Sequence, residues 1–217
     1  MELLSSSART TATALQNPPS DAQLIDACTT GDLSRVQILV HCHGIRVTAR
    51  DASRQVTPLH MACAEGHAAI VAWIVEWTRL MLEYHETNNE HDDTSYNEAI
   101  PQNNTDSYDD DDFDDDDNFG GGILHTNDPL LAPSVTYLLQ ATDSVGNTPL
   151  HYACVNGHVP IVRMLAKAMV NDVEGWRHVY FTQNHHGRTP LEWAQKTHKH
   201  AIVKELQRWK PPPERPI

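Results

Sequence analysis

Two stretches of the sequence decide the fold: Thr57–His67, which reads TPLHMACAEGH, and Thr148–His158, which reads TPLHYACVNGH. They differ at three positions only. A third copy starts at Thr189 with TPLEWA, and a weaker first copy has Ala22 in the place of the threonine. In that first copy the matching residues are Leu24, Ala27, Cys28, Gly31, Val36 and Leu39. Self-similarity of this kind indicates an array of repeated structural units.

Each position of the repeat has a physical reason. The threonine can cap a helix, and the proline suits the first helical position, where a missing N–H costs nothing. The glycine of Gly66 and Gly157 allows a left-handed turn at the end of that helix. An apolar pair further on, Ile70-Val71 in the second copy, is typical of the buried stripe of another helix. The pattern therefore predicts a turn, a helix, a second turn and an antiparallel helix.

This unit resembles the ankyrin repeat, whose fingerprint includes Thr-Pro-Leu-His-x-Ala. The resemblance implies an all-α solenoid of four helix-pair repeats, because a single pair cannot bury its own core. We expect a disordered tail over residues 1–20, repeats one and two over 21–83, repeats three and four over 132–209 and a proline-rich tail over 210–217. Repeat four has Glu192 and His198 where histidine and glycine are expected, and a terminal capping position accounts for both.

A long insertion separates the second and third copies. Thr57 and Thr148 are 91 residues apart, against a usual period of about 33. We expect the second helix of repeat two to run from Ala68 to about Glu83 and residues 84–131 to be disordered, since they are rich in Asn, Asp, Ser, Gly and Pro.

The insertion also holds most of the negative charge. The chain of 217 residues has a net charge of -13, and no lysine or arginine lies between Arg79 and Arg163. Eight aspartates surround Phe113: Asp109, Asp110, Asp111, Asp112, Asp114, Asp115, Asp116 and Asp117. This acidic run has two interpretations, a polyanionic arm that captures a basic protein and a solvated spacer. It lacks the spaced ligands and turn glycine of a calcium loop. Ser95 and Ser107 each precede an acid by three residues and are candidate phosphorylation sites.

Several classes of function have no support in the sequence. Direct binding to nucleic acid needs a basic face, which the charge distribution does not provide. No apolar stretch is long enough for a membrane helix. His41-Cys42-His43 lacks a second ligand pair at zinc spacing, and no catalytic motif is present. We therefore expect no metal, no cofactor and no enzymatic activity. We expect a monomer in the cytoplasm, with the nucleus left open as a second compartment.

The resemblance to ankyrin binders also indicates where a partner would bind. The variable contact positions are the turn residues and the pair before the helix-ending glycine. In this sequence they are Arg50, Asp51, Ser53, Ala64, Glu65, Asp143, Ser144, Asn147, Val155, Asn156 and Arg188. Tyr152 and Trp193 are either aromatic anchors beside these positions or part of the packing between repeats.

These observations favour a protein-binding module that acts as carrier or chaperone of a basic protein. The layout is similar to that of small fungal ankyrin-repeat chaperones of a small-subunit ribosomal protein, which also have an extended connection before the third repeat. There too a Gly-Asn-Thr turn opens that repeat, as Gly146-Asn147-Thr148 does here. In those chaperones the acidic region follows the repeats, whereas here it lies within them. The alternative is a signalling or scaffold adaptor with the insertion as a spacer.

Overall fold

The described structure is all-helical and confirms the predicted fold class. It is a computed structural model that describes residues 19–89 and 134–213. The helices are α1 (Asp21–Thr30), α2 (Leu33–His41), α3 (Pro58–Glu65), α4 (Ala68–Asn89), α5 (Val135–Gln140), α6 (Pro149–Asn156), α7 (Val159–Ala168), α8 (Val173–Phe181), α9 (Pro190–Lys196) and α10 (His200–Arg208). The acidic run Asp109–Asp117, both candidate phosphoserines and the ends of the chain lie outside the described residues.

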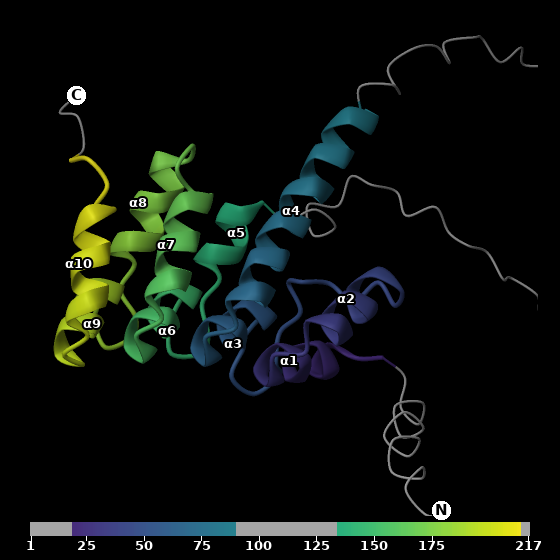
Figure 1. Ribbon diagram of the computed structural model, residues 1–217, viewed down its shortest axis with the longest axis horizontal. Coiled ribbons are helices and arrows are strands. Elements are labelled where there is room, and N and C mark those ends of the chain that lie inside the picture. The colour runs from purple at the N-terminus through teal and green to yellow at the C-terminus, as the bar shows by residue number, and fades with distance from the viewer. Residues whose placement is uncertain (1–18, 90–133, 214–217) are drawn as a thin grey trace, which may run out of the picture.

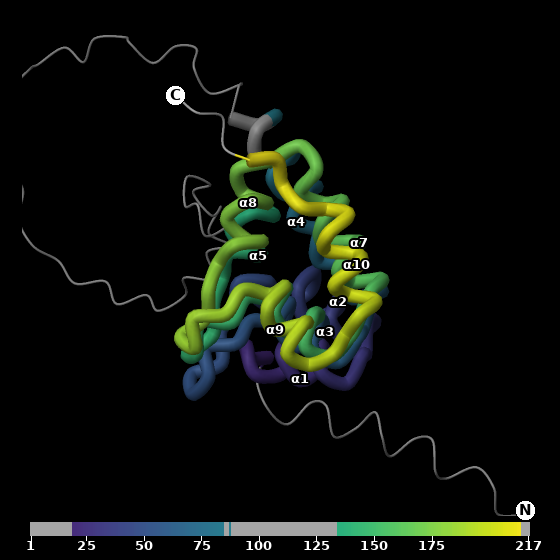
Figure 2. Tube along the Cα trace, turned by 90° about the vertical axis from the view of Figure 1, so that its left-hand side faces the viewer, coloured from purple at the N-terminus to yellow at the C-terminus, as the bar shows by residue number. Residues whose placement is uncertain are grey.

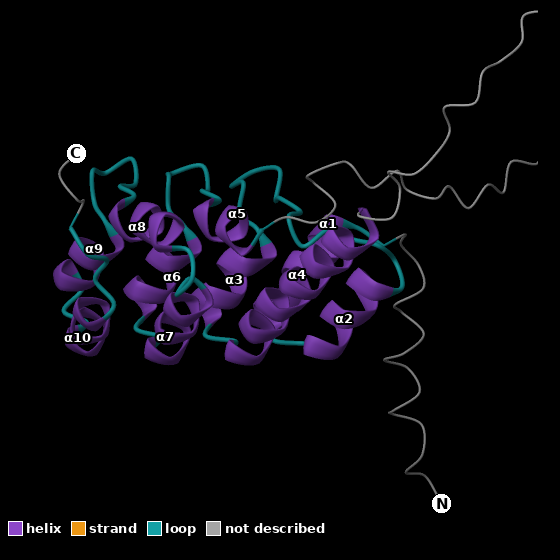
Figure 3. Ribbon diagram, turned by 90° about the horizontal axis from the view of Figure 1, so that it is seen from above, coloured by secondary structure: helices purple, strands orange, loops and turns teal. Residues whose placement is uncertain are grey.

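Four helix pairs form one row. The pairs α1/α2, α3/α4, α6/α7 and α9/α10 follow each other from one end of the molecule to the other (Figure 1). Viewed along the row, the first helices stack behind one another and so do the second helices (Figure 2). Seen from above, the turns that precede the first helices form one edge of the array (Figure 3). The predicted repeat unit is therefore the unit that the chain uses.

The repeat sequence produces this geometry through its helix ends. In repeat two, Thr57 caps α3 and Pro58 occupies its first turn. Gly66 ends the helix in the left-handed region at φ 86°, which costs a residue without a Cβ little. Gly157 does the same in repeat three at φ 89°. In repeat four the residue at this place is His198, and it keeps the left-handed conformation at φ 56°.

The core is a continuous strip of small and large apolar side chains. Leu59 and Leu150 of the fingerprint are fully buried, as is Ile161 of the following stripe. Cys28, Cys63 and Cys154 occupy equivalent buried places, and burial raises the pKa of each thiol. They are free thiols with a packing role, as the repeat predicts.

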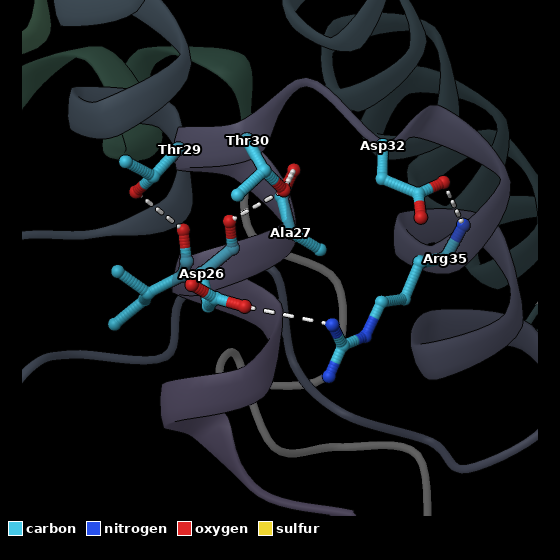
Figure 4. A network of polar contacts seen from close by, with 7 residues as sticks. Asp26, Ala27, Thr29, Thr30, Asp32 and Arg35 are labelled. Carbon is cyan, nitrogen blue, oxygen red and sulfur yellow. Dashed lines mark hydrogen bonds and ion pairs between the residues drawn. The ribbon is translucent and has the colours of Figure 1, made fainter. Parts of the chain in front are cut away.

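The first repeat, which matches the fingerprint least, has several polar contacts within and between its own two helices. Figure 4 shows Asp32 accepting a hydrogen bond from the backbone N–H of Arg35 at 2.9 Å, which caps α2. The Arg35 guanidinium also reaches Asp26 of α1 at 3.5 Å. The hydroxyl groups of Thr29 and Thr30 donate to carbonyls one turn earlier in α1. Both threonines thus satisfy carbonyls near the helix end, where helical partners run out.

The structure corrects the expected end of the second helix in repeat two. We expected it near Glu83, but α4 continues to Asn89 and projects beyond the other helices (Figure 1). Thr78 is the last of its fully buried residues, and Leu80 and Tyr84 beyond it are at least half exposed. Good helix formers such as Leu, Met and Glu continue the helix after the neighbouring helix α2 has ended at His41.

Two further helices, α5 and α8, were not predicted. They lie one behind the other on the side of the array away from α7 and α10 (Figure 2). The Thr136 hydroxyl donates to the Asp172 carboxylate, which also accepts from the backbone N–H of Gly175 at 2.8 Å. A Cβ on Gly175 would meet the Asp172 carboxylate, so a larger residue there would push the Asp172 side chain out of its present position. The spacing of 41 residues between Thr148 and Thr189 exceeds the usual period of about 33, and the extra residues form α8.

Candidate binding surface on the inner face

The candidate site is the inner face, defined here as the turns 50–55, 142–147 and 183–188 together with the adjoining sides of α3, α6 and α9. Each turn is built around an acid or amide. Asp143 accepts hydrogen bonds from the backbone N–H groups of Val145 and Asn147 at 2.8 and 2.7 Å. Asn184 makes the same pair of contacts one repeat later, and Asp51 holds the backbone of Arg54 at 2.8 Å. Side chains of this kind favour tight turns because they bond their own backbone.

Neighbouring turns are also joined to each other. The backbone N–H of Ser144 donates to the Arg54 carbonyl at 2.8 Å, and that of His185 donates to the Val145 carbonyl at 2.9 Å. The Arg50 guanidinium spans the gap to the Thr142 carbonyl at 2.8 Å. The turns thus form a hydrogen-bonded edge that holds the inner face in a fixed shape.

In repeats two and three, one histidine connects the first helix to the turn of the next repeat. The Nδ1 of His60 accepts from the backbone N–H of Thr57 at 3.1 Å, so its Nε2 carries the proton and donates to the Asn147 carbonyl at 3.0 Å. His151 repeats this arrangement with Thr148 and the Arg188 carbonyl. Burial lowers the pKa of His60 to about 4, and burial also lowers the pKa of His151.

In repeat four, Glu192 stands in the place of these histidines. Its carboxylate accepts from the backbone N–H of Thr189 at 2.8 Å and completes the capping box. Within the described residues no later helix pair offers a carbonyl to this place. The substitution is compatible with the expected capping position of repeat four.

His67 and His158 connect in the opposite direction. Each follows the helix-ending glycine of its repeat, and each Nε2 lies at hydrogen-bond distance from a carbonyl of the preceding repeat. These carbonyls are Thr29 at 3.0 Å and Ala64 at 2.9 Å. Four of the fourteen histidines are thus explained by packing of the array, and the described residues hold no cluster of His, Cys, Asp or Glu that could bind a metal.

One side chain from each of three repeats faces the turns from the first helix. These are Met61, Tyr152 and Trp193, which occupy equivalent positions and are each partly exposed. The Tyr152 hydroxyl donates to Asp143 at 2.8 Å, and its ring meets the His60 ring edge-on at 5.6 Å. Burial, together with the bond to Asp143, raises the pKa of Tyr152 to about 12. Tyr152 thus packs between repeats and keeps part of its surface exposed, and its role as an aromatic anchor stays a prediction.

Two cationic side chains lie over the ring of Trp193. The Arg188 guanidinium lies 5.4 Å and the Lys196 ammonium 5.3 Å from the ring centre, both within the usual range of a cation–π contact. The His186 ring stacks on the indole at 6.2 Å and 14°. Arg54, Met61, His186 and Lys196 were not among the predicted contact residues. Met61 could have been found from its shared repeat position, and Lys196 from its place one helical turn after Trp193.

Several predicted contact residues are engaged in holding the array together. Asp143 is buried, and hydrogen bonds from Asn147 and Tyr152 lower its carboxyl pKa although burial alone would raise it. Asn147 accepts from Asn184 at 2.8 Å, and Asn156 donates to the Ala64 carbonyl at 2.8 Å. Asp51 and Arg50 have the turn contacts described above. The exposed or partly exposed positions that remain are Ser53, Ala64, Glu65, Ser144, Val155, Arg188, Tyr152 and Trp193.

Comparison with known proteins agrees with this architecture. The family model described as ankyrin repeats (3 copies) matches residues 129–210, and the model for a single ankyrin repeat matches residues 54–83. Together they take in just over half of the chain. The chain belongs to the ankyrin-repeat family, whose members use such arrays to bind proteins.

Among solved structures, the fold is similar to that of the chaperone Yar1 in the crystal structure of the yeast ribosomal protein Rps3 in complex with Yar1. The TM-score is 0.54 at 18% sequence identity, and the alignment covers 92% of this chain and 99% of the other. No curated protein matches the sequence. No helix in the two described stretches is both long and apolar enough to cross a membrane.

Proposed function

We propose that this protein is a non-enzymatic carrier or chaperone of a basic protein, for which a small-subunit ribosomal protein is the leading candidate. The row formed by Met61, Tyr152 and Trp193 carries the proposal. Two of the three, Tyr152 and Trp193, are aromatic residues of the kind that is enriched among those that contribute most to binding at protein interfaces. The turns beside them are hydrogen-bonded to each other, so little ordering is needed when a partner binds.

The acidic run supports the choice of a basic partner. Asp109–Asp117 supplies eight carboxylates, while the described residues are close to electrically neutral. A dense cluster of charge accelerates the encounter with an oppositely charged protein. The attraction weakens as salt is added. The likeness of the fold to Yar1, which is the chaperone of Rps3 in its structure, is compatible with the proposal.

Yeast Rps3 is a suitable first probe. Binding would be measured by calorimetry at about 50 mM and about 500 mM salt, where the screening lengths differ about threefold. Protection of Rps3 from aggregation would be followed by light scattering. We compare the native chain with a variant whose eight aspartates in Asp109–Asp117 are asparagines. We expect the native chain to bind Rps3 in low salt and keep it soluble, and the variant to lose about tenfold in affinity together with most of the salt dependence.

A second pair of variants tests the inner face. Trp193→Ala removes the ring on that face, whereas Trp73→Ala removes a tryptophan of α4 that stacks on Trp77 away from it. We expect only Trp193→Ala to weaken Rps3 binding, by about tenfold. If Rps3 and other basic proteins bind as well with asparagines and at both salt concentrations, the chaperone proposal is wrong. The adaptor with a spacer insertion would then be the better explanation.

A further inference from the structure

The C-terminal end of the array carries a surplus of positive charge. The helices α7, α8 and α10 with their flanking residues, 159–181 and 199–213, hold seven lysines and arginines against three acids. Residues 19–89 of repeats one and two show the reverse, with five lysines and arginines against eight acids. A hydrogen bond from Thr136 lowers the pKa of Asp172, and one from Arg163 lowers the pKa of Glu205 to about 2. Both acids are thus ionised at neutral pH, and the surplus remains when they are counted.

Much of this surplus lies on exposed side chains. Glu205 is buried and pairs with Arg163 at 2.8 Å, and Glu174 pairs with Arg177 at 3.3 Å. The basic surface is defined here as the exposed cations of α7, of α10 and of the segment after α10, which are Lys167, Lys204, Arg208 and Lys210. Within the two described stretches, none of these four takes part in an ion pair. Carboxylates of a partner would complement their charge.

A hollow with apolar walls opens beside the basic surface. It has a volume of about 170 Å³ and lies between the end of α7, the start of α8 and the segment that follows α10. Figure 2 shows this segment crossing from α10 toward α8. Val170, Val173 and Trp209 contribute to the walls, and the charged residues that line the hollow are Arg208 and Lys210. No carboxylate is among the described residues that line it.

Hydrogen bonds hold the aromatic part of the wall in place. The Nε1–H of Trp176, which also lines the hollow, donates to the Trp209 carbonyl at 2.7 Å. The Nε1–H of Trp209 donates in turn to the Glu205 carboxylate at 3.1 Å. Arg163 donates to the same carboxylate at 2.8 Å. A wall fixed in this way needs little ordering when a ligand binds.

We propose that the hollow and the basic surface bind an acidic segment of a second protein that carries a leucine or phenylalanine among its carboxylates. The apolar side chain enters the hollow, since an apolar cavity of about 150 Å³ can take up a molecule the size of benzene. The neighbouring carboxylates contact Arg208 and Lys210 on its rim. This goes beyond the proposed function, because the surface lies outside the inner face and the partner has the opposite charge.

The walls favour a protein segment over a nucleic acid. Unpaired bases bind mainly by stacking on exposed aromatic rings, but Trp176 is buried and Trp209 is only partly exposed. Val170 and Val173, which are 60% and 44% exposed, offer aliphatic surface instead. Aliphatic surface of this kind gains most from burying an apolar side chain.

The test is fluorescence anisotropy with the full chain and a fluorescein-labelled peptide of sequence Glu-Asp-Glu-Leu-Glu-Asp-Glu. A second peptide has serine in place of leucine and therefore the same charge. At about 50 mM salt we expect the leucine peptide to bind about tenfold more tightly than the serine peptide, because its side chain leaves water. At about 500 mM salt the affinity of both should fall about tenfold. Equal affinities, affinities that salt does not change, or no binding would overturn the proposal.

Two double variants assign the site by charge. Arg208→Glu with Lys210→Glu reverses the rim of the hollow, and Arg46→Glu with Arg79→Glu reverses two exposed cations of repeats one and two. The first pair should weaken binding of the leucine peptide about tenfold and the second pair should leave it unchanged. Equal losses would show a nonspecific attraction and overturn the site. If circular dichroism shows that the first pair does not fold, glutamine at both positions removes the same two charges.

A third double variant tests the apolar wall. Val170→Ser with Val173→Ser leaves the charge of the protein unchanged. It should remove the preference for the leucine peptide and leave the affinity for the serine peptide as it was. A preserved preference would place the leucine elsewhere and overturn the role of the hollow.

Two comparisons decide between occupants. The leucine peptide is also measured with the variant whose eight aspartates in Asp109–Asp117 are asparagines, and we expect both chains to bind it. Binding by that variant alone would assign the surface to the chain's own aspartates and overturn a second protein. A labelled oligouridine of similar charge should bind more weakly than the leucine peptide, and tighter binding would indicate a nucleic acid and overturn the proposal. The Rps3 experiment depends on the acidic run and Trp193, so either proposal can fail without the other.

Discussion

His60 provides a direct test of the histidine connections between repeats, through the variant His60→Gln. Glutamine can accept from the Thr57 N–H and donate to the Asn147 carbonyl, but it does not titrate. Native His60 must stay neutral to accept at Nδ1, and burial lowers its pKa from 6.5 to about 4. The unfolded chain therefore takes up a proton at this residue in a pH range where the folded chain does not.

The sign and size of the effect follow from this difference in pKa. The stabilisation from the lowered pKa is fully present above pH 6.5 and is lost as the pH falls toward 4. The complete loss amounts to about 3 kcal/mol, of which about 2 kcal/mol is lost by pH 5. His151 acts in the same direction in both proteins, because burial lowers its pKa too. Its contribution therefore cancels when the variant is compared with the native chain.

The free energy of unfolding would be measured by urea denaturation, followed by circular dichroism, at about pH 7.5 and about pH 5. We expect the native chain to lose about 2 kcal/mol more than His60→Gln between the two values. If both proteins lose the same free energy to within about 0.5 kcal/mol, His60 is not a neutral buried connection and the reasoning is wrong.

Three further predictions concern other parts of the array. His198→Gly should stabilise the protein by about 1 kcal/mol, because His198 has a left-handed backbone at φ 56°, which strains a residue with a Cβ. Urea denaturation would measure the free energy of unfolding, and an unchanged value would argue against strain at His198. Glu205→Gln should cost about 2 kcal/mol at neutral pH, because Glu205 accepts two bonds from Arg163 and one from Trp209. Hydrogen bonding to Arg163 lowers the pKa of Glu205 to about 2, so this penalty should fade as the pH drops from about 4.5 toward 2, and a constant penalty would contradict it. Of the four cysteines, only the exposed Cys42 should react rapidly with a thiol reagent in the folded chain, and rapid reaction of two or more would show that the buried strip opens.

The sequence predicts those elements whose signals are local. Thr57, Pro58 and Gly66 each act within one helix and its ends, so their pattern predicts α3 wherever it occurs. The same holds for α6 and, with less of the fingerprint, for α9. The predicted roles of Cys63 and Cys154 are also confirmed, because a shared repeat position implies a shared buried environment.

The elements that the sequence does not predict depend on packing between distant parts. In α8, Trp176, Val179 and Tyr180 are buried at helical spacing, but the helix is short and contains Gly175. Gly175 leaves room for the Asp172 side chain, which bonds Thr136 of α5, and this contact cannot be read from the sequence around α8.

The inner face shows the same limit. Whether Asp143 contacts a partner or holds a turn depends on Tyr152 and Asn147, which the fold brings to it. The binding roles of the exposed inner-face residues stay predictions.

Glu192 has a consequence for the growth of the array. A repeat with histidine at this place offers its Nε2 to a carbonyl that only another repeat can supply, whereas a carboxylate offers no proton. Repeat four thus lacks the donor with which repeats two and three each hold the next turn. A designer who appends a further copy after repeat four would change Glu192 to histidine to recover this contact, although Ile25 at the equivalent place of repeat one shows that a repeat can also stack without it. The residue at this one place therefore decides which junctions of the array carry a side-chain hydrogen bond.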